Sequence, residues 1–142
     1  MQDADFEDYI QNRYEREIAW YDRRAQQNQW LHRGLQLYAI AASVTIPVLL
    51  SVEDLPEVAI GALAASVAAA GGIMALLKPN ENWLNYRATA ETLRKELHLY
   101  RAAAGEYEKA PDRKKVFVER VEALISREHT VWLTTAARRE ER

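Results

Sequence analysis

Residues 34–77 read GLQLYAIAASVTIPVLLSVEDLPEVAIGALAASVAAAGGIMALL and contain no Lys or Arg. The segment holds two apolar runs, one of 19 residues at 34–52 and one of 20 residues at 58–77, separated by the acidic sequence EDLPE. At a rise of 1.5 Å per residue, each run makes a helix of about 30 Å, which matches the hydrocarbon thickness of a bilayer. The sequence therefore predicts two transmembrane helices joined as a hairpin.

The alternative is a soluble bundle in which both apolar helices are buried on all sides. A chain of 142 residues leaves little protein to cover two helices that are apolar all round, so we favour membrane insertion. A cleaved signal peptide is not expected, because residues 1–9 (MQDADFEDY) are acidic where a signal peptide is basic. The first apolar helix is therefore expected to stay in the mature protein.

The flanking charges predict the orientation of this hairpin. All 19 Lys and Arg residues lie at or before Arg33 or at or after Lys78, whereas the linker at 53–57 carries three acids and no base. By the positive-inside rule, both termini are cytoplasmic and the linker faces outward. We expect Trp30 at the depth of the lipid headgroups, with Arg33 and Lys78 pointing toward lipid phosphates.

The rest of the chain predicts further helices, over residues 5–33, 80–104 and 112–137. We predict one domain, residues 1–142, of the all-α class: an integral membrane protein whose transmembrane hairpin continues into a cytoplasmic helical bundle. The stripes expected to pack are Ile10, Tyr14, Ile18, Tyr21, Ala25, Asn28, His32 and Leu35; then Trp83, Tyr86, Ala90, Leu93, Leu97, Tyr100 and Ala104; and finally Phe117, Val121, Leu124, Glu128, Val131 and Thr135.

Composition argues against several classes of function. The net charge is −2, the chain has no Cys, and its three His residues are scattered. These features disfavour nucleic-acid binding through overall charge, a disulfide framework and a metal site. No nucleophile elbow or phosphate-binding glycine loop is present. We therefore expect no enzyme activity, no catalytic residue, no metal and no cofactor.

The larger cytoplasmic side chains are interpreted as structural. The expected core residues are Trp20, Tyr21, Asn28, Trp83, Tyr86, Arg87, Glu91 and Trp132. Trp83, Tyr86 and Arg87 are expected to lie against the first helix near Trp20, Tyr21 and Asn28. Arg87, Glu91 and Lys95 follow one another at intervals of one turn, so we predict a charged network with Asp22 or Asn28.

Several short motifs carry a resemblance to a known family. They are WYDxxAxxN at 20–28, NWxxYR at 82–87, ExLxxE at 91–96, Tyr100, GxY at 105–107, FVE at 117–119 and Trp132. Together they resemble the SLATT superfamily of prokaryotic two-transmembrane effector domains. The resemblance implies a protein of the bacterial inner membrane that oligomerises and forms a pore, often as a defence effector. We expect its trigger to come from a separate sensor or regulatory protein, a ligand or a lipid.

Two helices cannot enclose an aqueous path, so conduction requires a homo-oligomer. The candidate pore-lining residues are Gln36, Ser43, Thr45, Pro47 and Ser66. Pro47 leaves the carbonyl of Ser43 without its helical donor, and this oxygen and the nearby hydroxyls suit a cation. The alternative is that the hydroxyls bond back to their own helix. No charged residue lies within either apolar run, which favours a passive pore over a pump.

Two further features bear on assembly. At the outer end, Glu53, Asp54 and Glu57 form an acidic ring in an oligomer, or else simply a polar loop. In the second apolar run, Gly61, Ala65, Ala69 and Gly72 have the spacing at which small residues allow helices to approach closely. This small face packs on a neighbouring subunit, on the first apolar helix of the same chain, or on both.

The sequence thus predicts an oligomeric membrane pore or ion channel with a preference for cations, acting as an effector in a bacterial defence or stress system. The alternatives are a non-conducting membrane scaffold that recruits a cytoplasmic partner, and an effector that damages the lipid without a defined channel. The expected partners are the lipid bilayer, further copies of the chain and a separate regulatory protein, without nucleic acid.

Overall fold

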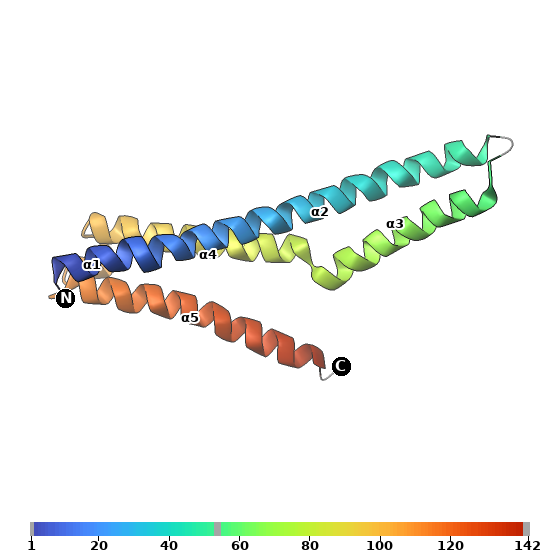
Figure 1. Ribbon diagram of the computed structural model, residues 1–142. Coiled ribbons are helices and arrows are strands. Elements are labelled where there is room, and N and C mark those ends of the chain that lie inside the picture. The colour runs from blue at the N-terminus through green and yellow to red at the C-terminus, as the bar shows by residue number, and fades with distance from the viewer. Residues whose placement is uncertain (1, 53–54, 141–142) are drawn as a thin grey trace. The chain divides into compact units, whose positions relative to one another are not determined.

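The computed structural model describes residues 2–52 and 55–140, and the side chains of residues 2–52 and 55–126 (Figure 1). Within these ranges every regular element is a helix and no strand occurs. The elements are α1 (Asp3–Tyr9), the π-helix η1 (Ile10–Tyr14), α2 (Glu15–Leu50), α3 (Glu57–Leu77), α4 (Pro79–Arg101), the 3₁₀ helix η2 (Gly105–Tyr107) and α5 (Arg113–Glu140). The prediction of an all-α protein is confirmed.

The chain groups into two compact units. The bundle unit comprises Met1–Asp22 and Arg87–Arg142, and the hairpin unit comprises Arg23–Tyr86. Both boundaries fall inside helices, because α2 contains Asp22 and Arg23 and α4 contains Tyr86 and Arg87.

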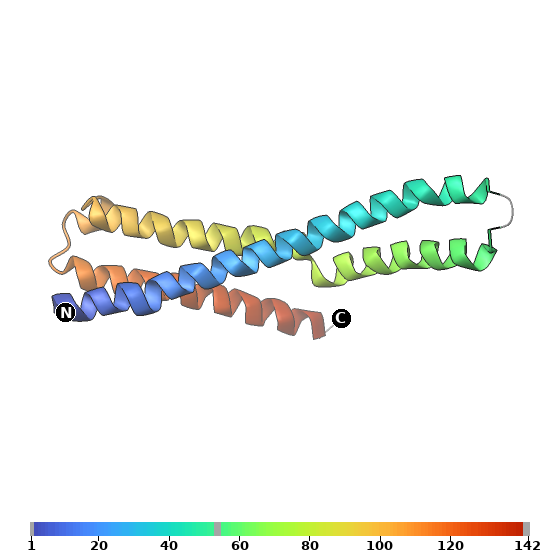
Figure 2. The same ribbon diagram turned by 45° about the horizontal axis from the view of Figure 1, so that its top comes forward.

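The hairpin unit contains the two apolar helices. α2 continues through Pro47 and ends at Leu50, and α3 runs back antiparallel to it from Glu57 (Figure 2). By length and composition, two helices of the described chain are able to cross a membrane, and only 6% of the most apolar window of each is buried. A pair of helices covered by surrounding protein would be mostly buried, so the fully buried soluble alternative does not fit this structure.

The turn from α3 to α4 is a one-residue break. Lys78 adopts the left-handed conformation at φ 46°, which ends α3, and the buried Pro79 begins α4. Proline suits the first helical position because the missing N–H has no partner there in any helix. The side-chain amide of Asn82 donates from Nδ2 to the carbonyl oxygen of Leu77 at 2.9 Å and satisfies one of the last carbonyls of α3.

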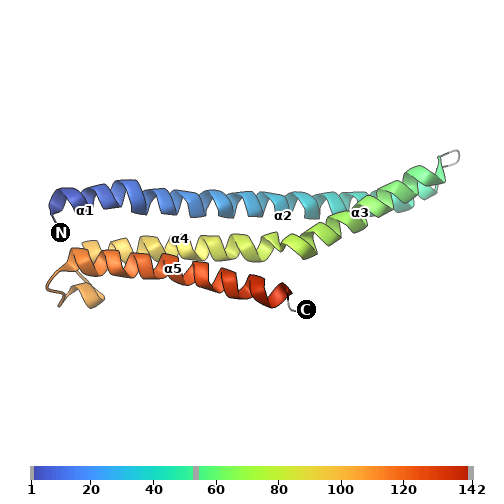
Figure 3. The same cartoon turned by 60° about the horizontal axis from the view of Figure 1, so that its bottom comes forward.

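The core of the bundle unit is a cluster of aromatic rings in which Phe117 of α5 is central. The centroid of its ring lies 5.8 Å from Phe6, 5.4 Å from Tyr14 and 5.1 Å from Tyr100. These contacts join α1 and η1 to α4 and α5, and Figure 3 shows α4 and α5 side by side. Offset and edge-on ring pairs contribute stability beyond the apolar area that they bury.

Outside the two apolar runs, the predicted stripes supply eight of the buried positions. Those confirmed as buried are Ile10, Tyr14, Tyr21, Ala25, Ala90, Leu93, Phe117 and Val121. The stripes omitted Phe6, Tyr107 and Glu96, which are all buried. On α5 the buried residue after Val121 is Ile125, while the predicted Leu124 is half-buried. Glu128, Val131 and Thr135 lie outside the described side chains.

Candidate functional site

The hairpin unit presents one packed face on each of its apolar helices. The buried or half-buried positions recur at steps of three and four residues, as in a coiled-coil seam. They are Leu35, Ala39, Ala42, Ile46 and Leu49 on α2, and Ile60, Leu63, Val67, Ala70 and Met74 on α3. This seam defines the packed face of each helix and leaves the other faces open.

One polar contact joins the two helices across this seam. Tyr38 Oη is hydrogen-bonded to Ser66 Oγ, and Ser66 Oγ is 2.7 Å from the carbonyl oxygen of Leu63. Since a hydroxyl has one proton, Ser66 donates to Leu63 and accepts from Tyr38. Ser66, a candidate for the pore lining, is therefore engaged within its own chain.

The other pore-lining candidates separate into two groups. Thr45 Oγ1 donates to the carbonyl oxygen of Ala41 at 2.8 Å, so this hydroxyl bonds back to its own helix. Gln36, Ser43 and Pro47 are exposed, and their steps of seven and four residues place them along one flank of α2, outside the seam. This polar flank also carries the carbonyl of Ser43, which Pro47 deprives of a donor.

The small-residue face of α3 does not pack on α2. Gly61, Ala65, Ala69 and Gly72 are all exposed and lie on the side of α3 opposite its seam. A Cβ atom added at Gly61 or Gly72 would meet nothing within 4 Å. Of the two packing roles considered for this face, the one within the chain is excluded by this arrangement.

At the end of the hairpin where α2 and α3 are connected, Glu57 lies exposed in the first turn of α3. The two remaining acids of the predicted outer mouth, Glu53 and Asp54, lie outside the described residues. Trp132, a predicted core residue, lies outside the described side chains.

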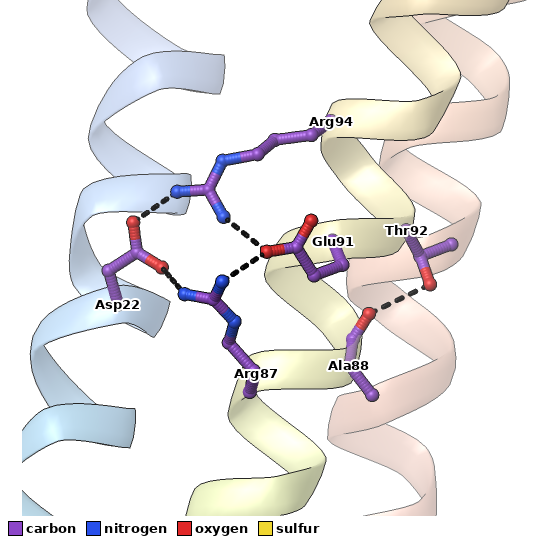
Figure 4. A network of polar contacts seen from close by, with 6 residues as sticks. All are labelled: Asp22, Arg87, Ala88, Glu91, Thr92 and Arg94. Carbon is purple, nitrogen blue, oxygen red and sulfur yellow. Dashed lines mark hydrogen bonds and ion pairs between the residues drawn. The ribbon is translucent and has the colours of Figure 1, made fainter.

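A charged network in the bundle unit connects α2 to α4 (Figure 4). The Arg87 guanidinium lies 2.7 Å from Glu91 and 4.0 Å from Asp22 Oδ1, so the predicted network with Asp22 is confirmed. Arg94, which the prediction omitted in favour of Lys95, pairs with Asp22 Oδ2 and with Glu91 at 3.2 Å. Asp22 Oδ1 is itself buried and has no hydrogen-bond partner among the described residues, so both arginines are needed to offset its charge.

The remaining predicted core residues differ in burial. Tyr21 is 1% exposed, whereas Trp20 is 38% exposed and makes an edge-on contact with the Tyr21 ring at 5.0 Å. In the hairpin unit, Asn28, Trp83 and Tyr86 are half-buried. The indole N–H of Trp83 donates to Asn80 at 3.1 Å. The expected packing of Trp83 beside Trp20 stays a prediction.

A buried carboxylate that the sequence reasoning missed joins the far end of α4 to α5. Glu96 is 5% exposed, accepts a hydrogen bond from Tyr107 Oη at 2.5 Å and pairs with Arg120. Burial and this hydrogen bond raise the pKa of Tyr107, and the hydrogen bond to Glu96 raises the pKa of Arg120. Glu96 and Tyr107 both belong to the short motifs noted above, so those motifs meet here in space.

A second ion pair ties α1 and η1 to α5. Glu122 accepts from Tyr9 Oη at 3.0 Å and from Arg13 Nε at 3.2 Å. The hydrogen bond from Arg13 lowers the pKa of Glu122, and burial, together with Glu122, raises the pKa of Tyr9. The polar groups of the bundle unit are thus used chiefly to fix helix pairing.

The bundle unit has a shallow groove of about 260 Å³ between α2 and α4. Its walls include Glu15, Ile18 and Asp22 on one side and Leu97 and His98 on the other. Over the described residues, no group of three or more His, Asp or Glu side chains is placed to hold a metal ion.

The comparison with protein families gives one result. A family model described as a protein of unknown function, DUF4231, matches residues 16–115. The chain belongs to this family. No curated protein and no solved structure matches the chain.

The DUF4231 match contains both apolar helices and the Asp22 network, together with the Tyr38–Ser66 and Glu96–Tyr107 contacts. It ends before Arg120 and Glu122, the α5 partners in the two ion pairs just described. The match therefore covers the hairpin and the helices that continue from it.

Proposed function

We propose that this protein inserts its α2–α3 hairpin into a bacterial inner membrane and assembles with copies of itself into a passive pore that prefers cations. Both termini lie on the cytoplasmic side. Two helices that are long, apolar and 6% buried in their most apolar windows support insertion, because lipid covers apolar surface that the protein leaves exposed.

The observation that carries the proposal is the division of faces in the hairpin. The seam uses one face of each helix, and the small-residue face of α3 (Gly61, Ala65, Ala69 and Gly72) is left open. In lipid, small residues favour helix association through close packing. A second copy on this face begins the assembly that a lumen requires.

The polar flank of α2 supplies the lining in this proposal. Gln36, Ser43 and the freed carbonyl of Ser43 offer oxygen ligands and no charge, which suits the passive movement of cations. Glu57, with its neighbours Glu53 and Asp54, adds negative charge at the outer mouth and raises the local concentration of cations.

The resemblance of the sequence motifs supports a role as an effector. DUF4231 is associated with SLATT-like domains, and the motifs of this chain resemble the SLATT superfamily. We therefore propose that the pore acts in a bacterial defence or stress response and that a separate sensor or regulatory protein triggers it.

The second candidate function is a non-conducting scaffold that recruits a cytoplasmic partner. The groove between α2 and α4, which is lined by apolar residues such as Ile18 and Leu97 and by charged ones such as Glu15 and Asp22, favours this candidate. In that case the hairpin serves only as an anchor.

A flux assay with reconstituted vesicles separates these functions. Vesicles are loaded with K⁺ and with a large anionic dye, and the release of each is followed after protein insertion. A pore releases K⁺ and retains the dye, and a scaffold releases neither. Release of both at the same rate indicates membrane damage without a defined channel and contradicts the proposal.

A further inference from the structure

One face of α2, turned away from the seam, is apolar along the apolar run and carries a charged residue and an aromatic residue at the cytoplasmic end of that run. Leu37, Val44 and Val48 on this face are 68%, 68% and 61% exposed. Their spacing continues to Arg33 and then to Trp30, one helical turn further, and the Trp30 side chain is 74% exposed. An apolar stripe, a guanidinium and an indole therefore follow one another in order along a single face.

The charge of Arg33, at this end of the hairpin unit, is not balanced by any described side chain. The sequence from Arg23 to Val52 contains three Arg and no acidic residue. On the neighbouring segment, Glu81 pairs with Lys78 at 3.1 Å. Arg33 is exposed and forms no ion pair with any described side chain. The guanidinium is thus available to an anion from outside the chain.

We propose that Trp30 and Arg33 bind the phosphate headgroup of an anionic phospholipid in the cytoplasmic leaflet. The inference rests on the membrane insertion proposed above. A guanidinium presents paired donors that match phosphate oxygens, and its long stem lets the charge reach the headgroups while its methylenes stay in the apolar layer. The apolar ring and the N–H donor of an indole suit the same depth in the membrane.

The proposed binding site differs from a general attraction to a charged surface because its side chains have a fixed order along one helix face. Arg33 precedes Leu37 by four residues and follows Trp30 by three, so all three side chains share one face of a continuous helix. A lipid lying along this face contacts Leu37 with its acyl chain, Arg33 with its phosphate and Trp30 with the outer part of its headgroup.

The test uses the quenching of tryptophan fluorescence by brominated lipids. The full chain and its Trp30→Phe variant are reconstituted in phosphatidylcholine vesicles that contain an equal mole fraction of brominated phosphatidylglycerol or of brominated phosphatidylcholine. The quenching that is lost in Trp30→Phe reports the lipids next to Trp30. We expect brominated phosphatidylglycerol to quench this signal more strongly.

The matched variants are Arg33→Gln and, as a control, Lys115→Gln on the exposed surface of α5. Arg33→Gln should lower the preference for the anionic lipid about fivefold, which corresponds to about 1 kcal/mol for one basic residue near an anionic surface. Lys115→Gln should keep the full preference, and circular dichroism verifies that both variants are folded.

Three results would overturn the proposal, and they differ in what else they contradict. Equal quenching by the two brominated lipids, or an unchanged preference in Arg33→Gln, rejects the lipid site while membrane insertion stands. Absence of quenching by either lipid places Trp30 outside the bilayer and rejects the proposed insertion as well.

Discussion

Tyr38 of α2 donates a hydrogen bond to Ser66 of α3, and the Ser66 hydroxyl donates in turn to the carbonyl oxygen of Leu63. The contact fixes the register of the hairpin, because it ties one position on each apolar helix. Once the register is fixed, the polar flank of α2 and the small-residue face of α3 are both directed away from the seam.

Tyr38→Phe removes this hydroxyl and keeps the ring. We expect the hairpin to lose about 1 kcal/mol, the typical value for one hydrogen bond between membrane helices. Thermal unfolding of the protein in mild detergent measures this change in stability. Thr45→Val is the matched control, since its hydroxyl bonds only to the carbonyl of its own helix. Equal stability of Tyr38→Phe and the native chain would show that the contact does not hold the hairpin.

Ala65→Leu should loosen the proposed oligomer. The larger side chain separates two helices that approach each other through small residues. The control is Ala64→Leu, which changes another exposed alanine that points about 100° away around α3. Crosslinking in native membranes measures the assembly. A native chain that stays monomeric, or an equal effect of both variants, would count against the small-residue face as the interface.

Asp22→Asn should destabilise the bundle unit by about 1 to 2 kcal/mol, between the values for exposed and for buried ion pairs. The variant removes the negative charge that two arginines share, and it leaves Arg87 and Arg94 facing each other with Glu91 alone between them. Glu119→Gln, in an exposed pair with Lys115 at 3.9 Å, should change stability by less than about 0.5 kcal/mol. Thermal unfolding compares the two variants, and equal melting temperatures would refute the assigned role of Asp22.

The Glu122 pair predicts sensitivity to acid. Arg13 lowers the pKa of Glu122 in the folded chain, so the pair stabilises the fold above the unfolded pKa of about 4.3. This stabilisation is lost as the pH falls through the lowered folded value. The native chain should therefore be more stable than Glu122→Gln at pH 7, and the difference should shrink under acid conditions. A difference in melting temperature that stays constant with pH would contradict this assignment.

Much of the fold follows from the periodicity of apolar residues. Ile10, Tyr14, Tyr21 and Ala25 are buried as the spacing predicts, because a helix packed on one side buries every third or fourth residue. Periodicity does not decide between Leu124 and Ile125, since both suit a helix face. The choice depends on how α5 lies against its neighbours, which a single helix pattern does not contain.

The candidate site was harder to predict from the sequence than the fold. Glu96 carries a charge and is expected at the surface, yet it is buried because Tyr107 and Arg120, 11 and 24 residues away, supply its partners. Thr45 and Ser43 look alike as hydroxyl residues of one helix. Only the hydrogen bond of Thr45 to Ala41 and the face on which each lies separate them.

That separation predicts different effects on conduction. Ser43→Val removes a hydroxyl from the polar flank and should change the single-channel conductance, because an oxygen ligand near the path is lost. Thr45→Val removes a hydroxyl that bonds within the helix and should leave the conductance close to that of the native chain. The reverse order of effects would move the lining to another face of α2.

The central claim, an oligomeric pore that prefers cations, is tested most directly by recording currents from the purified protein in a planar bilayer with different salt concentrations on the two sides. We predict discrete current steps and a reversal potential with the sign expected for cation selectivity. The reversal potential should move closer to zero when Glu53, Asp54 and Glu57 are neutralised together. Silence at all voltages, irregular leak without steps, or a reversal potential on the anion side would contradict the account.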